Sequence, residues 1–289
     1  MFTGNVYSKE VWFNDLGVVT EAILAFTLVA TAIYFLNDVV DIKADQAHPF
    51  KRKRPIAAGK VSKRLAIGYF IFASLAGLTW SYSLSILYFI SVLIYWLMQV
   101  FYSLWLKNIE VVDVFIIALG FFIRVFAGAI VINAHLSIWF LLCVISTSLF
   151  LAVGKRRAEL AILTEQSVVQ HRKVMGKYSS DILDSYLSMF ATAAFLSWAL
   201  YTFNFYDQVE LAAPTATTLP LVSRTLTINK WLMATIPVVI FGIMRYIRII
   251  YDGSRAESPE RVILADSPLL SSVLIWGIMV LGVLYSSWL

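Results

Sequence analysis

Four side chains around residue 40 carry the oxygen atoms best suited to chemistry in this chain. Asn37, Asp38, Asp41 and Asp45 follow a long apolar run. If a helix continues to Asp45, then Asn37, Asp41 and Asp45 stand at positions i, i+4 and i+8 on one helix face. Amide and carboxylate oxygens aligned in this way suit Mg²⁺, which takes hard oxygen ligands and keeps coordination positions for water or phosphate. The segment therefore predicts a magnesium and phosphate site.

Basic residues follow directly. His48, Lys51 and Arg54 could hold the oxygens of a phosphate group. A loop rich in Lys and Arg is also expected at the cytoplasmic face of any membrane protein, so the basic run alone says little about function. The carboxylates carry more weight, because aligned carboxylates repel one another unless a cation accompanies them. We therefore favour a catalytic or metal-binding role over a solvated loop.

The composition places these residues at a membrane. Hydrophobic residues make up 60% of the chain and charged residues only 14%, against about a quarter charged in soluble proteins. A bilayer is crossed by roughly twenty apolar residues in a helix. The sequence predicts an all-α, polytopic membrane bundle, read as one domain over residues 1–289, with eight spans: 15–37, 65–83, 86–105, 112–132, 137–153, 183–203, 230–250 and 268–289.

The positions of the basic residues predict the orientation. Alternating spans place the segments 38–64, 106–111, 154–182 and 245–267 on one side, and these hold most of the Lys and Arg residues. That side is expected to be the cytoplasm, with the chain in the inner (plasma) membrane. The net charge of +5 then reflects topology and contact with anionic lipids, and no nucleic acid is expected as a partner. A homo-oligomer is compatible with this pattern.

Charged or polar side chains inside or beside spans are further candidates, because burying them in a bilayer is costly. Arg124 lies in the middle of a predicted span, where it would face a polar cavity or pair with a buried carboxylate. Tyr102 and Lys107 gather with Asp113 at the cytoplasmic ends of two spans. Lys107 could bind a phosphate or serve only as an interfacial anchor.

The third basic segment offers a second set of candidates. Lys155 and Glu159 are spaced i, i+4, so they could pair on a helix; alternatively, Glu159 could be a metal ligand with Lys155 and Arg156 on phosphate. Tyr178 begins the next apolar run. Two aspartates there, Asp181 and Asp184, could cap the following helix.

These motifs together resemble the UbiA superfamily of intramembrane prenyltransferases, and within it the branch of polyprenyl-phosphate (decaprenyl-phosphate type) phosphoribosyltransferases. The resemblance covers nearly the whole chain. It is carried by the strings Asn37-Asp38-x-x-Asp41-x-x-x-Asp45, Asp45-x-x-His48-Pro49-x-Lys51-x-x-Arg54-Pro55, Tyr102-Ser103-x-x-Leu106-Lys107, Arg124-x-x-Ala127-Gly128-Ala129, Gly154-Lys155-Arg156-x-x-Glu159-Leu160 and Pro259-Glu260-x-Val262-x-Leu264-x-Asp266.

Two departures from the superfamily pattern bear on the function. Members typically have nine membrane helices, so the resemblance implies that a helix before the first span is missing from this chain. Aromatic prenyltransferases of the superfamily carry a second Asp-x-x-x-Asp motif for a second magnesium, whereas this chain has Lys155-Arg156-x-x-Glu159 and the offset pair Asp181 and Asp184. Extra cations suit a reaction that joins several anionic groups.

The resemblance implies transfer of 5-phosphoribosyl from phosphoribosyl diphosphate to a polyprenyl (decaprenyl) phosphate, with Mg²⁺ as cofactor. Its metal ligands would be Asn37, Asp41, Asp45 and Glu159, with Asp38 supporting the cluster. The expected substrate and phosphate contacts are His48, Lys51, Arg54, Tyr102, Lys107, Arg124, Lys155, Arg156 and Tyr178. Two alternatives remain: an aromatic (4-hydroxybenzoate-type) prenyltransferase that uses a polyprenyl diphosphate, or a non-catalytic protein that binds lipid phosphates.

Overall fold

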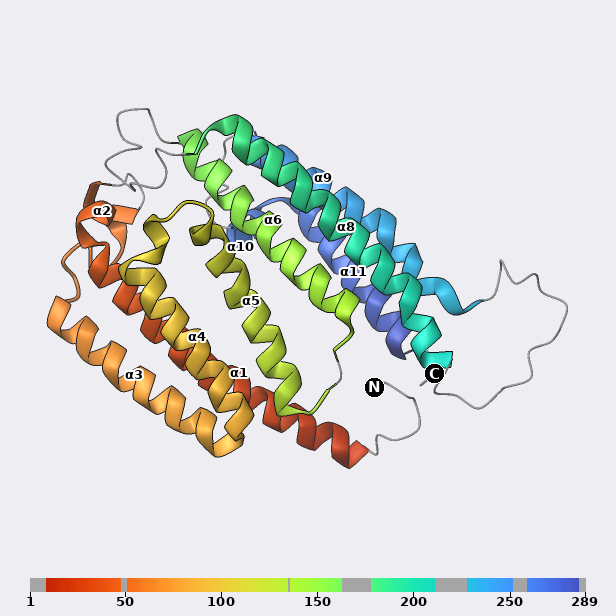
Figure 1. The fold of residues 1–289 in the computed structure, drawn as a ribbon, viewed down its shortest axis with the longest axis horizontal. Helices are drawn as coiled ribbons and strands as arrows, with labels where there is room; N and C mark the ends of the chain where they lie inside the picture. The colour runs from red at the N-terminus through yellow and green to blue at the C-terminus, as the bar shows by residue number, and fades with distance from the viewer. Residues whose placement is uncertain are drawn as a thin grey trace, which may run out of the picture. The chain divides into compact units, whose positions relative to one another are not determined.

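The computed structural model describes residues 9–47, 51–134, 136–162, 178–210, 228–251 and 259–285 (Figure 1). Within these ranges the secondary structure is helical, as the sequence predicts. Among the described residues, seven helices are long and apolar enough to cross a membrane: Asp15–Val40, Lys63–Leu84, Ile86–Leu104, Val112–Val131, Ile138–Ala161, Ser180–Phe205 and Trp231–Tyr251. The eighth predicted span falls on a shorter apolar helix, Ser267–Val283.

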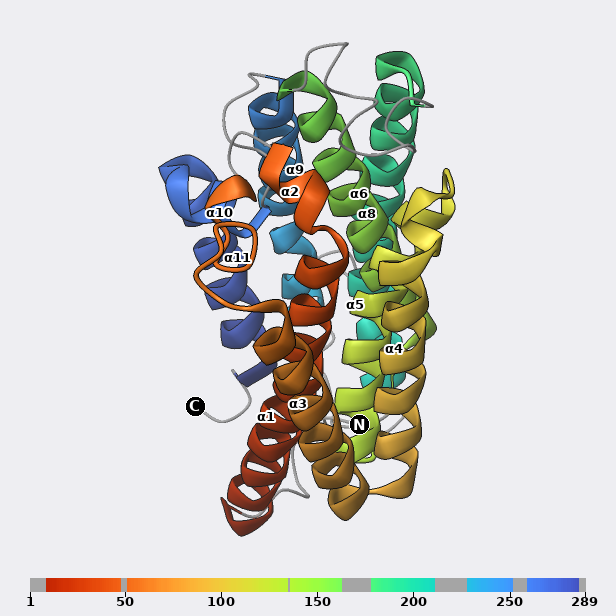
Figure 2. The same ribbon diagram turned by 90° about the vertical axis from the view of Figure 1, so that its left-hand side faces the viewer.

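The chain divides into two compact units. The N-terminal unit comprises Lys9–Leu136 and Ile162–Leu183, and the C-terminal unit is built on Ser137–Ala161 and Asp184–Leu289. The described part of the N-terminal unit contains four long helices: α1 (Lys9–Val40), α3 (Lys63–Leu84), α4 (Ile86–Leu104) and α5 (Val112–Val131). Within it α1 lies beside α3, α4 and α5, and α4 lies beside α3 and α5 (Figure 2).

Small residues let α1 and α3 approach closely. A Cβ at Gly77 of α3 would lie 2.5 Å from Val29 Cγ2 on α1, so a larger residue could not fit there without a shift. The adjoining core of the unit consists of Ala22, Phe26, Val29, Tyr88, Val92, Tyr95 and Ala127. The Tyr88 hydroxyl donates a 2.6 Å hydrogen bond to the Ala22 carbonyl and so joins α4 to α1. These contacts join α1 to α3 and α4 along the apolar part of the helix.

The end of α1 is bent without losing its helical register. α1 stops at Val40, Asp41 forms a turn, and the short helix α2 (Ile42–Ala47) follows. Two i to i−4 backbone hydrogen bonds bridge the interruption, from Asp41 N to Asn37 O (2.9 Å) and from Asp45 N to Asp41 O (2.8 Å). The expected i, i+4, i+8 alignment is therefore present in the backbone.

A compact turn returns the chain from α2 to α3. The 3₁₀ helix η1 (Lys51–Lys53) is followed by a turn in which Ala58 N donates to Arg54 O and Lys60 N donates to Pro55 O. Gly59 has φ of +75°, a left-handed conformation that glycine adopts without steric cost. Ser62 then caps α3 by accepting a hydrogen bond from Leu65 N.

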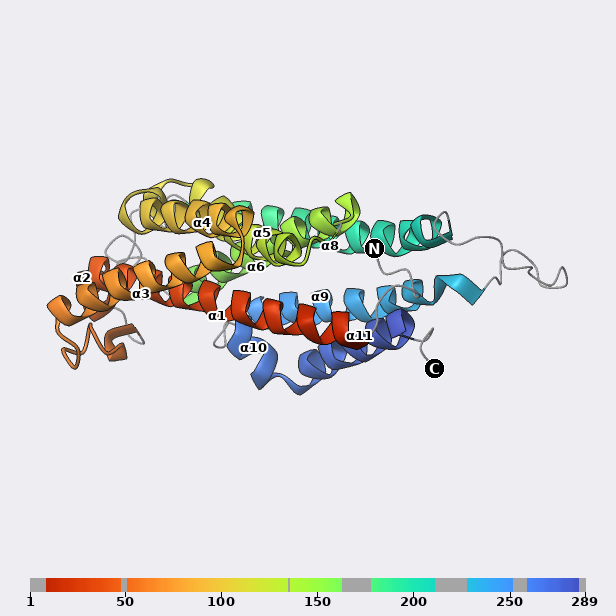
Figure 3. The ribbon, with the colours of Figure 1, turned by 90° about the horizontal axis from the view of Figure 1, so that it is seen from below.

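The C-terminal unit contains α6 (Ile138–Ile162), α8 (Ser180–Glu210), η5 (Ile228–Thr235), α9 (Ile236–Tyr251), α10 (Pro259–Ala265) and α11 (Ser267–Tyr285). α6 and α8 run antiparallel, because Phe140 contacts Tyr201 and Arg157 pairs with Asp184. α9 and α11 lie side by side (Figure 3). A further link is the 2.9 Å hydrogen bond from Trp198 Nε1 to Thr235 Oγ1.

Candidate active site

The aspartate cluster lies where α1 meets α2. Asn37 and Asp38 occupy the last turn of α1, Asp41 the turn residue and Asp45 the second half of α2. Asp45 is only 4% exposed. The helical register thus brings three predicted carboxylates and the Asn37 amide to one end of the N-terminal unit.

Two cations are inserted among these carboxylates. Arg54 donates through Nη1 to Asp38 Oδ1 at 2.7 Å and to Asp45 Oδ2 at 3.0 Å. Lys107 reaches the cluster from the connection between α4 and α5, and its ammonium donates to Asp41 Oδ1. Both cations were predicted to bind phosphate, and both lie in direct contact with the aspartates.

Burial disfavours the charged form of the Asp45 carboxylate. Removal from water raises the pKa of Asp45, and the carboxylates of Asp38 and Asp41 act in the same direction, whereas Arg54 and Lys51 oppose the shift. Because the two basic residues do not fully offset the burial of this carboxylate, a further cation at the same face would be stabilised.

The donor set fits a magnesium ion in one specific respect. The Asn37 Oδ1 atom is buried and has no hydrogen-bond partner within the described ranges. Buried polar atoms without a hydrogen-bond partner are rare in folded proteins, and at a functional site an ion or a water molecule commonly binds such an atom. Within the same ranges no three His, Cys, Asp or Glu side chains are grouped as a metal centre, so the predicted set depends on this amide and on two carboxylates.

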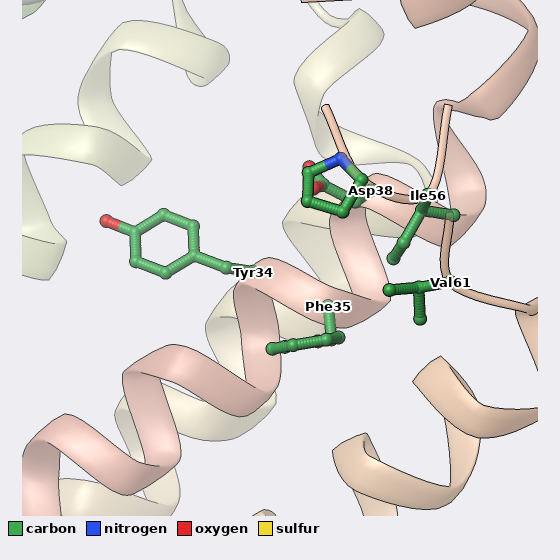
Figure 4. A pocket seen from close by; sticks show the side chains of 6 residues that line it. Tyr34, Phe35, Asp38, Ile56 and Val61 are labelled. Carbon is green, nitrogen blue, oxygen red and sulfur yellow. The ribbon is translucent and has the colours of Figure 1, made fainter. Parts of the chain in front are cut away.

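An apolar pocket opens beside Asp38 (Figure 4). It is lined by Tyr34, Phe35, Asp38, Pro55, Ile56 and Val61. Two of these residues come from the apolar part of α1 and three from the turn that follows η1. The arrangement places an apolar surface next to the ion pair of Asp38 and Arg54.

A second buried polar group, formed by Asp113 and Tyr178, lies at the start of α5, shortly after Lys107 in the sequence. The Tyr178 hydroxyl donates to Asp113 Oδ1 at 2.8 Å and accepts from Val111 N at 2.7 Å. Asp113 is fully buried and Tyr178 is 5% exposed. Sequence reasoning placed Asp113 near Lys107 but did not connect it to Tyr178, since only the folded chain brings them together.

Arg124 lies in the same unit, within the apolar span of α5. Its guanidinium donates a 2.6 Å hydrogen bond to Tyr95 Oη and lies 5.0 to 5.7 Å from the ring centres of Tyr95, Phe121 and Phe26. It has no carboxylate partner among the residues that the structure describes, so the alternative of a buried ion pair is not what the structure contains. Cation–π contacts instead accommodate the charge.

The remaining candidates lie on η1, α4 and α6 or outside the described residues. Lys51 lies on η1 and Tyr102 in the last turn of α4, whereas His48 lies outside the described residues. Near the end of α6, Arg156 is buried and pairs with Glu159 at i, i+3 spacing. Lys155, Arg156 and Glu159 all belong to the C-terminal unit, and the ion pair joins the last two.

Of the two aspartates predicted at the start of α8, Asp181 lies in the first turn, where it can favour the helix dipole, and Asp184 lies beyond it. The Ser179 hydroxyl accepts from Ile182 N, and Asp184 pairs with Arg157 of α6 at 2.6 Å. Capping therefore comes from a serine, and Asp184 joins two helices of the C-terminal unit.

Comparison with known proteins identifies a matching family and similar proteins that share one name. Residues 1–156 match the UbiA prenyltransferase family. The decaprenyl-phosphate phosphoribosyltransferase of Mycolicibacterium smegmatis is 35% identical over 261 residues, which cover 89% of this chain and 77% of that protein. The protein of the same name from Corynebacterium glutamicum is 30% identical over 277 residues, covering 94% and 78% of the two chains.

Solved structures show the same fold at low sequence identity. A UbiA homolog from Archaeoglobus fulgidus, bound to GPP and Mg²⁺, aligns with a TM-score of 0.63 and 16% identity over 93% of this chain and 87% of that one. A structure of digeranylgeranylglyceryl phosphate synthase aligns with a TM-score of 0.54 and 14% identity, covering 92% and 94%.

Proposed function

The chain belongs to the UbiA prenyltransferase family, and we propose that this multi-pass membrane transferase moves 5-phosphoribosyl from phosphoribosyl diphosphate to a polyprenyl phosphate. Diphosphate is released. The relatives at 30% to 35% identity that carry the name decaprenyl-phosphate phosphoribosyltransferase support this choice over other reactions of the family. A polyprenyl chain of decaprenyl type is the proposed lipid.

The observation that carries the proposal is the insertion of Arg54 and Lys107 among the aspartates. Phosphoribosyl diphosphate bears a diphosphate and a 5-phosphate, and its acceptor bears another phosphate. These groups repel one another and must still approach within about 3–3.5 Å for reaction. Fixed cations beside a metal-binding face lower that repulsion. An aromatic acceptor would need far less positive charge.

Magnesium would be held by Asn37, Asp41 and Asp45, and when bound it would supply charge neutralisation for the departing diphosphate. Asp38 would keep Arg54 oriented towards this face. Arg54 and Lys107 would bind phosphate oxygens through charge-assisted hydrogen bonds. These residues together would hold the donor with its anomeric carbon facing the acceptor.

The bond changes are a displacement at the anomeric carbon. An oxygen of the lipid phosphate forms a bond to this carbon while the bond to the diphosphate oxygen breaks. A phosphate monoester is already ionised near neutral pH, so no side chain needs to act as general base. The apolar pocket beside Asp38 offers a surface for the lipid next to its phosphate.

Other candidates enter the proposal with defined roles. His48, Lys51 and Tyr102 would contribute contacts to the donor or the lipid phosphate, and Arg124 would contact the substrate cavity. Within the C-terminal unit, at the end of α6, Lys155 and Arg156 would bind phosphate and Glu159 would bind a metal ion. The distribution of basic residues supports a site that faces the cytoplasm from the inner membrane.

The direct test is an assay of the purified protein in lipid with labelled phosphoribosyl diphosphate and polyprenyl phosphate. Label should enter the lipid fraction only when Mg²⁺ is present. Product from polyprenyl diphosphate and 4-hydroxybenzoate would instead identify an aromatic prenyltransferase. Saturable binding of polyprenyl phosphate without any turnover would favour the non-catalytic alternative.

A further inference from the structure

The Tyr178 hydroxyl is engaged on both sides. It donates to the fully buried carboxylate of Asp113 and accepts from the backbone N–H of Val111. A direct contact between this hydroxyl and a substrate would require at least one of these bonds to be replaced. The geometry thus favours a role for Tyr178 inside the protein over the substrate contact that the family resemblance implies.

The residue held by this hydroxyl has an unusual backbone. Val111 has φ of +68° and ψ of −44° at the N-terminus of α5. A β-branched residue rarely adopts positive φ, because its side chain crowds the backbone there. Such a conformation persists when surrounding contacts enforce it, and it is concentrated at functional sites. The bond from Val111 N–H to Tyr178 is one contact that enforces it here.

Lys107 lies in the same short connection. η2 (Leu106–Asn108) joins α4 to Val111, and the hydrogen bond from Ile109 N to Leu106 O closes its turn. The next turn is set by the bond from Asp113 N to Ile109 O. Through these bonds the position of the Lys107 backbone depends on how Val111 and Asp113 are held. The Lys107 ammonium in turn contacts Asp41.

We infer that Tyr178 and Asp113 form a positioning pair for the proposed reaction. The pair fixes the connection between α4 and α5 in its strained form and so places the Lys107 ammonium beside Asp41, where the donor diphosphate would bind. This inference rests on the proposed function, since it assigns Lys107 to a phosphate of that donor. Neither member of the pair needs to touch a substrate.

Kinetics of Tyr178→Phe in the full-length protein in lipid provide the first test. Loss of the hydroxyl should raise KM for phosphoribosyl diphosphate about tenfold, the scale of one lost hydrogen bond, and leave KM for polyprenyl phosphate nearly unchanged. Tyr88→Phe is the matched control, because it removes an equally buried hydroxyl bond between α4 and α1, away from the connection. This control should leave both KM values unchanged.

Asp113 supplies a second pair of variants that does not depend on Tyr178→Phe folding well. Asp113→Asn keeps an oxygen that accepts from Tyr178, whereas Asp113→Leu removes it. We expect Asp113→Asn to lie close to the wild type and Asp113→Leu to match Tyr178→Phe. Equal effects of the two Asp113 variants would contradict the positioning role.

A double-mutant cycle decides whether Tyr178 acts through Lys107. If it does, Tyr178→Phe combined with Lys107→Met should be no worse than Lys107→Met alone, because the group being positioned is already gone. Losses that multiply would mean that Tyr178 acts on the substrate directly, and the inference would be overturned.

Hydrogen exchange gives a readout that needs no turnover. Amides of residues 107–113 should exchange faster in Tyr178→Phe and at the wild-type rate in Tyr88→Phe. Unchanged exchange over this segment would show that the pair does not hold it. Faster exchange with unchanged kinetics would also overturn the inference. A wild-type protein that makes no phosphoribosylated lipid would refute the proposed function, while the exchange experiment would still decide whether the pair holds the connection.

Discussion

Asn37 shows how one side chain can separate a functional role from a structural one. Its buried Oδ1 has no partner within the described part of the chain, which is unfavourable for folding. Replacement by an apolar residue of similar size should therefore keep or raise the stability of the fold. If the oxygen is a metal ligand, the same replacement should damage function.

We predict that Asn37→Leu retains or raises the unfolding temperature and raises the Mg²⁺ concentration needed for half-maximal activity. Asn37→Asp, which keeps an oxygen at the same position, should stay closer to the wild type. Thermal unfolding and Mg²⁺ titration of activity measure the two effects. A variant Asn37→Leu with a normal Mg²⁺ requirement would remove this residue from the metal site.

The carboxylates of Asp41 and Asp45 are expected to act as a set with Asn37. Asp41→Asn or Asp45→Asn should each reduce turnover by more than about tenfold, because loss of one charged ligand costs several kcal/mol of charge stabilisation. Asp15→Asn, on the same helix α1 but at its other end, is the control and should have little effect. Near-normal activity in both site variants would exclude the metal site.

Sequence reasoning at the residue scale was limited by tertiary contacts. The spacing of Asn37, Asp41 and Asp45 predicted one helix face, because i to i−4 periodicity is local. The partners of Arg124, by contrast, are aromatic rings on α1, α4 and α5, and no local pattern reveals them. The positive φ of Val111 is equally invisible in the sequence, since valine ordinarily disfavours it.

At the scale of elements, apolar runs predicted helices well because the thickness of the hydrocarbon layer sets their length. Differences arise where polar contacts extend a helix. The span predicted to end at residue 153 continues to Ala161, where Arg156 pairs with Glu159 and Arg157 pairs with Asp184. Such pairs satisfy charges beyond the apolar run, so hydropathy alone underestimates the helix.

The extension of α6 gives Lys155 a defined place one turn before Glu159. If Lys155 binds a phosphate of the donor, Lys155→Ala should raise KM for phosphoribosyl diphosphate about tenfold, within the 1.5–3 kcal/mol of a hydrogen bond to a charged group. Lys60→Ala, an exposed lysine in the turn before α3, should not change it. Steady-state kinetics decide the matter, and an unaltered KM for Lys155→Ala would exclude this contact.

The joint between α9 and α11 offers a stability test that is independent of catalysis. Asp266 accepts two hydrogen bonds from Arg245 of α9, at 3.0 and 2.7 Å, and caps α11 by accepting from Leu269 N. The hydrogen bonds from Arg245 hold the pKa of Asp266 below its usual range. A carboxyl with a lowered folded-state pKa stabilises the fold above its unfolded-state pKa and loses that contribution as the pH falls through the folded value.

We therefore expect Asp266→Asn, which can still cap α11, to unfold at a lower temperature than the wild type at neutral pH. The gap should close as the pH is lowered through and below the ordinary range of an aspartate. Thermal unfolding as a function of pH measures it. A gap that is constant with pH would show that the ion pair with Arg245 does not contribute.

At the scale of the whole molecule, the family, the all-helical fold and the membrane class follow from the sequence, because they rest on composition and on long motifs. The eighth predicted span, 268–289, falls on α11, whose apolar stretch covers Ser267–Val283 within the described residues. The roles of individual site residues stay predictions, since they depend on substrates and on contacts between distant segments.

Orientation in the membrane is the last property that the charge distribution predicts. Most Lys and Arg residues lie in segments on one side of the alternating spans, which should be the cytoplasm. After Cys143→Ser removes the single native cysteine, reporters at Lys53→Cys and Asn108→Cys should react with an impermeant reagent only from the cytoplasmic side. Reporters at Ser85→Cys, between α3 and α4, and at Asn133→Cys, after α5, should react only from the extracytoplasmic side.

Three further positions test the same orientation, although they are not among the residues that the structure describes. Arg172 and Glu257 are expected on the cytoplasmic side and Thr217 on the other side. Labelling of Lys53→Cys from outside would invert the orientation and place the aspartate cluster away from the cytoplasm, where its phosphorylated donor is expected.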